Sequence, residues 1–75
     1  MKKINGKYVL SATDKKRTQQ HCNGIARRAA YEGSVDAYLN TDTGDISYIE
    51  NVGLAYTVAS EPYEYICTAY TPVRA

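Results

Sequence analysis

Few residues in the chain have the types and spacing that catalysis needs. The only histidine, His21, is followed by Cys22, and this is the one arrangement that could pair a base with a nucleophile. Neighbouring side chains on a helix point about 100° apart, so a proton transfer between these two is geometrically poor. Glu61 and Glu64 could meet as a carboxylate pair, but nothing around them indicates a cleft. We therefore expect a protein without enzymatic activity.

The sequence does not indicate a metal or cofactor site either. Cys22 and Cys67 are the only cysteines, neither belongs to a Cys-x-x-Cys pair, and a single histidine offers no second imidazole ligand. The glycines lack the spacing of a phosphate-binding loop. We expect no metal and no cofactor, and we expect both cysteines to be reduced core thiols, because free cysteine behaves as a small apolar residue.

All eight aromatic residues of the 75-residue chain are tyrosines, and the stretch "YEYICTAY" at 63–70 holds three of them. A chain of this length is a single domain, 1–75, which buries only about 60% of the surface of its unfolded form. Tyrosine rings can complete such a thin core, and tyrosines are also enriched at protein interfaces. Both roles remain open. With no signal peptide and no long apolar run, we expect a cytoplasmic protein that does not enter a membrane.

Charge is divided sharply between the two halves of the chain, although the net charge is only +1. Residues 1–31 carry eight cations against the single carboxylate of Asp14, whereas residues 32–75 carry seven carboxylates against Arg74. The molecule should therefore be strongly polar if its halves face in different directions.

The basic half contains the only predicted helix, residues 14–32. Thr13 is a plausible N-cap, and Gly33 stands where a helix commonly ends. The spacing of Thr18, Cys22, Ile25 and Ala29 predicts a narrow buried stripe of small side chains. Before the helix, "NG" at 5–6 can turn a short strand back onto a strand at 7–11.

Alternating or β-prone segments follow the helix at 35–40, 46–50, 53–59 and 63–71. We expect them to form a meander. The predicted fold class is α+β, with a single helix packed on one face of a four- to five-stranded antiparallel sheet in the order β-α-β-β-β-β.

The hairpin between the segments 35–40 and 46–50 sets which side chains share a face. If Asp42, Thr43 and Gly44 form a three-residue loop, Tyr38 is expected to pair with Tyr48. Tyr38, Ile46 and Tyr48 then occupy the face away from the helix, with Asp36 and Glu50 at its border. A two-residue loop would instead turn Tyr48 inward.

Such a patch is typical of a protein-binding surface, with tyrosines at its centre and charges at its rim. The predicted protein-binding residues are Asp36, Tyr38, Ile46, Tyr48 and Glu50. The simpler explanation is that tyrosines favour strands on an open sheet.

The basic helix offers an alternative function, because its cations could follow a phosphate backbone. The candidate nucleic-acid-binding residues are Lys15, Lys16, Arg17, Arg27 and Arg28. The acidic sheet would repel phosphate, so only the helix side would serve a small nucleic-acid binder or transcriptional regulator. Ordinary helix solubility also accounts for these cations.

In size, tyrosine content and segregated charge, the chain resembles the small inhibitors that bacteriophages make against host or defence machinery, including anti-CRISPR proteins. The resemblance covers the layout of the whole chain and no motif. It implies stoichiometric binding that covers a functional surface of a larger bacterial complex. The acidic border at Asp36 and Glu50 favours docking on a basic patch, such as a nucleic-acid channel. A third possibility is a structural subunit whose sheet edge pairs with a copy of itself, so we expect a monomer or a homodimer.

Overall fold

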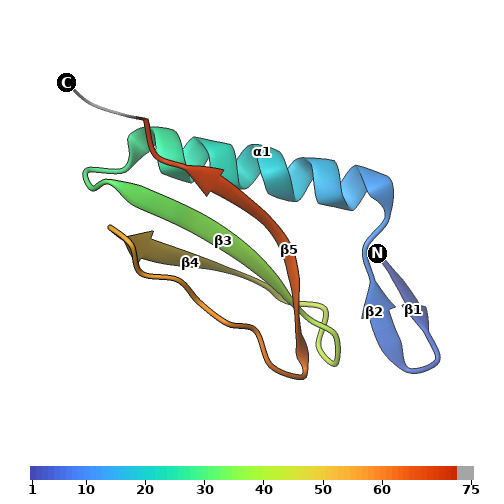
Figure 1. Cartoon of the computed structure of the whole chain (residues 1–75). Coiled ribbons are helices and arrows are strands. Elements are labelled where there is room, and N and C mark those ends of the chain that lie inside the picture. Colours follow the sequence, from blue (N-terminus) through green and yellow to red (C-terminus); the bar gives the residue numbers. More distant parts are fainter. Residues whose placement is uncertain (73–75) are drawn as a thin grey trace.

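One helix covers one face of a three-stranded antiparallel sheet, and a separate two-stranded hairpin stands at one end (Figure 1). The computed structural model describes residues 1–72. The helix is α1 (Ala12–Arg28) and the hairpin consists of β1 (Lys2–Ile4) and β2 (Lys7–Val9). The main sheet has the order β4-β3-β5 and is formed by β3 (Gly33–Asn40), β4 (Ile46–Val52) and β5 (Tyr63–Tyr70).

The predicted class, α+β with antiparallel strands, is confirmed, but the predicted single sheet is wrong. The strands form two sheets, and the order of elements is β-β-α-β-β-β. The predicted strand at 53–59 does not form, and β5 pairs with β3 instead of following β4 as in a meander. We call residues 53–62, which connect β4 to β5, the crossover segment.

The N-terminal hairpin is built on the turn that its sequence predicts. Asn5 and Gly6 both have positive φ angles, of 50° and 78°, as a type I′ turn requires. Three polar contacts join the hairpin to the rest of the described chain: the Tyr8 amide donates to the carbonyl oxygen of Thr41 at 2.8 Å, Lys7 pairs with Asp42 at 2.6 Å, and the N-terminal amine lies 3.3 Å from Asp14.

Helix α1 begins earlier and ends earlier than predicted. Ser11, not Thr13, is the N-cap: its side chain accepts from the Asp14 amide, and the Asp14 carboxylate accepts from the Ser11 amide. This reciprocal capping box satisfies two amides that a helix start leaves unpaired. At the other end Ala29 already has extended backbone angles, so Gly33 belongs to β3 and does not terminate the helix.

The core between α1 and the sheet is made of small residues, as the narrow stripe predicts. Its buried members are Cys22, Ala26, Val35, Ala37 and Ala69. Larger side chains close this thin core at its rim, and one of them is the ring of Tyr48. One tyrosine therefore has the structural role that the composition allows for.

Gly24 lies in the middle of α1, on the side away from the sheet. A Cβ atom placed there would meet only the Arg28 guanidinium group, at ordinary contact distances of 3.6 Å and beyond. Gly24→Ala should therefore raise the free energy of unfolding by about 1 kcal/mol, the difference in helix propensity. Thermal denaturation should show a rise in Tm of about 4–8 °C. An unchanged or lowered Tm would contradict the free space at this position.

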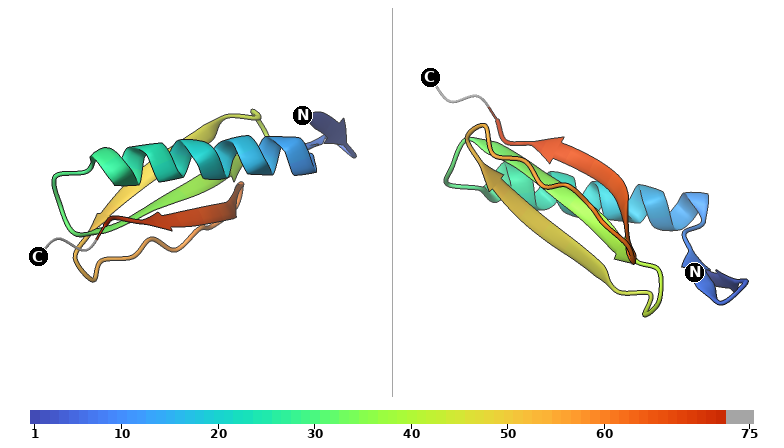
Figure 2. Two further views of the ribbon diagram at one scale, coloured as in Figure 1. Left: turned by 90° about the horizontal axis from the view of Figure 1, so that it is seen from above. Right: turned by 60° about the horizontal axis from the view of Figure 1, so that its bottom comes forward.

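The crossover segment runs along the face of the sheet opposite α1, which we call the open face (Figure 2). It is fixed at both ends and in the middle. The Gly53 amide donates to the Glu32 backbone carbonyl oxygen at 2.7 Å, the Tyr38 hydroxyl donates to the Thr57 carbonyl oxygen at 2.9 Å, and the Pro62 carbonyl oxygen accepts from the Thr41 amide at 2.9 Å. The Glu61–Pro62 peptide bond is cis. The three-stranded sheet is thus covered by the helix on one face and partly by an extended segment on the other.

Candidate binding surfaces

The hairpin register differs by one residue from the predicted register. Tyr38 lies opposite Ser47, and Tyr48 lies opposite Ala37. Because side chains alternate along a strand, this shift places Tyr38 and Tyr48 on opposite faces of the sheet. The predicted pairing of the two tyrosines is therefore wrong.

The physical reason lies at Thr41. Its amide and its hydroxyl both donate to the Pro62 carbonyl oxygen, and its own carbonyl oxygen accepts from the Tyr8 amide. Thr41 therefore cannot pair with Asp45, as the predicted three-residue loop requires. The Asp45 carbonyl oxygen accepts from the Asn40 amide instead, so the loop has one residue more. Gly44 keeps the expected left-handed conformation, with φ of 81°.

The five residues of the predicted patch do not form one face. Tyr48 lies on the helix side, where its ring packs against His21 with 4.5 Å between ring centroids. Ile46 packs against the core on the same side, and Glu50 follows there as an exposed residue. Tyr38 and Asp36 are on the open face, but they are only 5% and 8% exposed.

Asp36 is the centre of a polar network on the open face. Its carboxylate accepts from the Asn51 side-chain amide at 2.8 Å, from the Thr68 hydroxyl at 2.5 Å and from the Tyr38 hydroxyl at 3.4 Å. Burial, followed by the nearby Asp36 charge, raises the pKa of the Tyr38 hydroxyl, which keeps it a donor at neutral pH. Asn51 also accepts from the Thr57 hydroxyl at 2.8 Å. The network therefore holds the crossover segment on the sheet.

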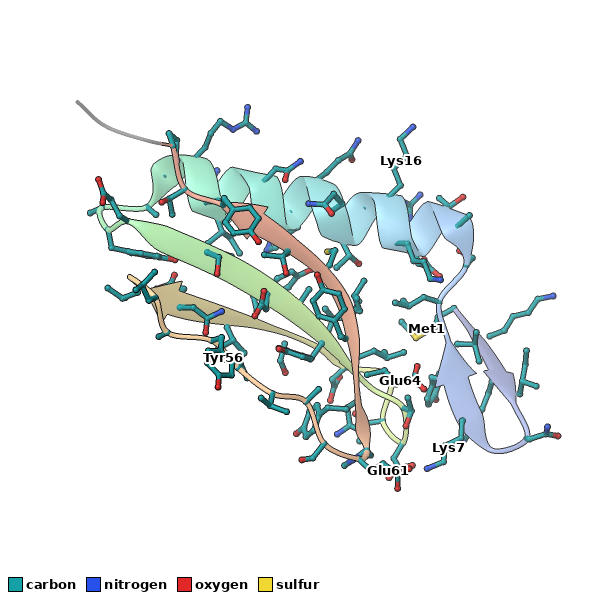
Figure 3. All side chains as sticks on the ribbon, viewed as in Figure 1. Met1, Lys7, Lys16, Tyr56, Glu61 and Glu64 are labelled. Carbon is teal, nitrogen blue, oxygen red and sulfur yellow. The ribbon has the colours of Figure 1, made fainter. Side chains whose placement is uncertain are left out.

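Exposed apolar and aromatic side chains cluster around this network. In the crossover segment Leu54, Tyr56 and Val58 are 100%, 81% and 77% exposed, whereas Thr57 and Ala59, between and beyond them, are half-buried. Figure 3 shows Tyr56 pointing away from the sheet. Together with exposed residues of the open face they make up what we call the aromatic surface: Ile49, Leu54, Tyr56, Val58, Tyr63, Tyr65 and Tyr70.

The sheet and the crossover segment meet in the aromatic surface at Val58. Ile49, Val58 and Tyr63 line a shallow cavity of about 220 Å³ above the ring of Tyr38. The Tyr65 ring also contacts Tyr38, edge to face, with 6.0 Å between centroids. All three tyrosines of the "YEYICTAY" stretch, Tyr63, Tyr65 and Tyr70, lie on the open face and are exposed to solvent.

Opposite charges are separated in space as well as in sequence. Residues 32–72 contain no lysine or arginine, so the sheet and the crossover segment carry only carboxylates. Arg74, the one cation of the second half, lies outside the described residues. Within residues 1–72 the two ion pairs, Lys7 with Asp42 and the N-terminal amine with Asp14, both join the N-terminal hairpin to its neighbours.

Four of the five predicted helix cations point away from the sheet. Lys16, Arg17, Arg27 and Arg28 lie within about 60° of the direction opposite to Cys22, at about 100° per residue. Figure 3 shows Lys16 above the helix, on the side of the molecule opposite to Tyr56. Lys15 differs, because it lies on the sheet side of α1 and lines a small cavity with Glu64. We call the four outward cations, together with Gln20 and Gly24 between them, the cationic face.

His21 and Cys22 have different surroundings, as their angular separation on the helix predicts. His21 is exposed beside Tyr48, whereas Cys22 is fully buried with its Sγ atom 3.8 Å from the Sγ of Cys67. Both cysteines are free. Burial raises the pKa of the Cys22 thiol to about 12, so it stays protonated at neutral pH. No group of three or more histidine, cysteine, aspartate or glutamate side chains suited to a metal ion occurs in residues 1–72.

Comparison with known proteins gives no relative: the chain matches no protein family, no characterised protein and no solved structure. In the described part of the chain, α1 has neither the length nor the apolar character that a membrane crossing requires. The surfaces must therefore be interpreted from their own geometry and charge.

The exposed side chains of the crossover segment were not predicted as functional residues. The alternation of Leu54, Tyr56 and Val58 indicates a strand, and a strand would have buried one side of it. The signal that could have identified them is composition: residues 51–60 contain no charged residue, and the breakers Gly53 and Pro62 stand near the two ends of this stretch.

Proposed function

We propose that the protein is a non-enzymatic binding protein, an inhibitor of the phage type that blocks a functional surface of a larger bacterial complex. The observation that carries this proposal is the outward presentation of Leu54, Tyr56 and Val58 on a segment fixed to the sheet. Small monomers rarely leave a contiguous apolar patch uncovered without a binding role. The proposed contact surface is the aromatic surface. It replaces the predicted patch, whose residues the observed β3–β4 register places on opposite faces of the sheet.

The fixed backbone of the crossover segment favours tight binding. Thr57 is bonded through its carbonyl oxygen to Tyr38 and through its hydroxyl to Asn51. Its neighbours Tyr56 and Val58 are therefore held outward before any partner arrives. Binding then requires little ordering of the chain, and the ordering of loops is one of the main costs of association.

The charge of this side indicates the chemistry of the partner. Glu61 and Glu64 are exposed beside the aromatic surface, and residues 32–72 contain no cation. Lys7, which is paired with Asp42, and Lys15 lie near them, so the carboxylates are partly balanced at the end of the molecule that faces the hairpin. Like charges across an interface are unfavourable, so the partner surface should be basic. The nucleic-acid channel of a host or defence complex, such as a CRISPR effector, has this property.

Truncating two anchors should abolish partner binding without unfolding the protein. The double variant Leu54→Ala/Tyr56→Ala should bind its target at least roughly 30-fold more weakly, because a single central aromatic anchor such as Tyr56 is worth about 2 kcal/mol or more. Immobilised wild-type protein captures the target from bacterial lysate, mass spectrometry identifies it, and the affinity of each variant for the purified target is then measured.

A matched control removes the same kind of exposed apolar surface elsewhere. Ile4 and Val9 are apolar residues of the N-terminal hairpin that are also exposed, at 51% and 44%. Ile4→Ala/Val9→Ala should therefore bind as the wild type does. Equal weakening of both double variants would contradict the assigned surface. Titration of the target's activity should reach its end point at one inhibitor per complex, and complete loss far below that ratio would contradict a stoichiometric block.

A further inference from the structure

We propose that the cationic face of α1 binds duplex nucleic acid by lying in the major groove, independently of the aromatic surface. The face has its cations at its two ends, Lys16 and Arg17 near the start of the helix and Arg27 and Arg28 at its last turn. Uncharged Gln20 and Gly24 lie between the two pairs. This arrangement places charge where the flanking phosphates would be and polar groups where the base edges would be.

The dimensions of the helix fit those of the groove. Lys16 and Arg27 are about 16 Å apart along the axis, at about 1.5 Å of rise per residue. The major groove is about 12 Å wide and admits an α-helix, so long side chains at both ends can reach the two backbones. The sheet and the crossover segment lie behind α1, which forms an outer layer of the molecule (Figure 2). The rest of the protein therefore leaves this face accessible.

The charge of the face is available to phosphates. Within the described residues, none of its four cations has a carboxylate partner, since the two ion pairs use Lys7 and the N-terminal amine. Asp14 is the only acid within α1, and it is occupied by the capping box and the N-terminal amine. Hydrogen bonds from Ser11 lower the pKa of Asp14, so its carboxylate is ionised at neutral pH and stays bonded at the start of the helix.

Gly24 is a second and independent feature of this face. It lies inside the helix where no core contact calls for a glycine, because only the Arg28 guanidinium group lies near the missing Cβ. Its backbone does not have the positive φ that would require glycine. A glycine in such a position costs helix stability and allows another backbone to approach closely. Insertion into a groove gives a use for that approach.

The first test measures binding to a fluorescent DNA duplex of about 20 base pairs, or two helical turns, by anisotropy between about 50 and 200 mM salt. Four phosphate contacts predict a slope of log K against log salt of about −3.6, and Arg27→Glu/Arg28→Glu should reduce it by about 1.8. Lys2→Glu/Lys3→Glu changes the net charge equally on the hairpin and should retain most of the affinity. Equal losses in the two variants, or no binding by the wild type, would overturn the proposal.

The second test separates groove insertion from charge alone. Gly24→Leu places a bulky side chain on the cationic face without changing its charge, and it should weaken duplex binding at least about tenfold even if the helix becomes more stable. Unchanged affinity of this variant, or equal affinity of the wild type for a single strand of the same sequence, would show that no groove is occupied.

Discussion

Gly33→Ala should lower the free energy of unfolding by about 3 kcal/mol or more, because a methyl group has no space there. A Cβ on Gly33 would lie 1.9 Å from the backbone carbonyl oxygen of Asn51 and 3.1 Å from the amide nitrogen of Gly53. Both obstacles are backbone atoms, so no side chain can move aside. Relief would require opening the end of the β3–β4 pairing, where the Gly53 amide is bonded to Glu32. Urea denaturation measures the loss.

Gly24→Ala provides the matched control for this change. The same methyl group is added in both variants, but the one at position 24 meets only the end of a flexible side chain. The two variants should therefore change stability in opposite directions. A Gly33→Ala protein with the urea midpoint of the wild type would contradict the close packing of β3 against the end of β4.

Local sequence signals predicted the elements whose conformation is decided locally. The Asn5–Gly6 turn, the existence of α1 and the positive φ of Gly44 each depend on a few neighbouring residues. Three of the four strands predicted after the helix also form, because alternation and β-branched residues mark them. The separation of charge in space partly follows from its separation along the chain, since four cations lie on the outer face of α1 and residues 32–72 contain no lysine or arginine.

The structural features that could not be predicted from the sequence depend on contacts between residues that are far apart in the chain. The hairpin register is fixed by Thr41, whose bonds go to Pro62 and Tyr8, and neither residue is near the turn in sequence. The pairing of β5 with β3 likewise requires the crossover segment to pass over the open face. Residues 53–59 have the alternation of a strand, but the chain must pass from β4, on one side of β3, to β5 on the other. The segment therefore crosses the open face and forms no strand, and its apolar side chains Leu54, Tyr56 and Val58 are exposed.

The buried network connects stability to the proposed binding surface. Asp36, Asn51 and Thr57 form a continuous path of hydrogen bonds from the middle of β3 to the crossover segment. The network explains why Asp36 is buried, although the sequence pattern predicts an exposed residue at the border of a tyrosine patch. Its carboxylate accepts three hydrogen bonds and is only 8% exposed.

Asp36→Ala should destabilise the protein by about 2–3 kcal/mol and also weaken binding through the aromatic surface. The substitution removes an acceptor used by Asn51, Thr68 and Tyr38, and buried donors without a partner each cost about 1–3 kcal/mol. Tyr38 and Thr68 keep other partners, which limits the loss. Urea denaturation gives the first quantity, and affinity for the captured target gives the second.

Asp36→Asn distinguishes the network from the mere presence of a side chain. The amide keeps the shape of the carboxylate and one acceptor oxygen, and the Thr68 hydroxyl can turn to accept from its NH₂ group while donating to Tyr65. We therefore expect a loss of only about 1 kcal/mol, with binding nearly retained. If Asp36→Ala lowered stability but left the affinity of the aromatic surface unchanged, the network would not be what holds Tyr56 and Val58 outward. If both variants were as stable as the wild type, the carboxylate would have no structural role, and the path from β3 to the crossover segment would have to run through Tyr38 and Thr57 alone.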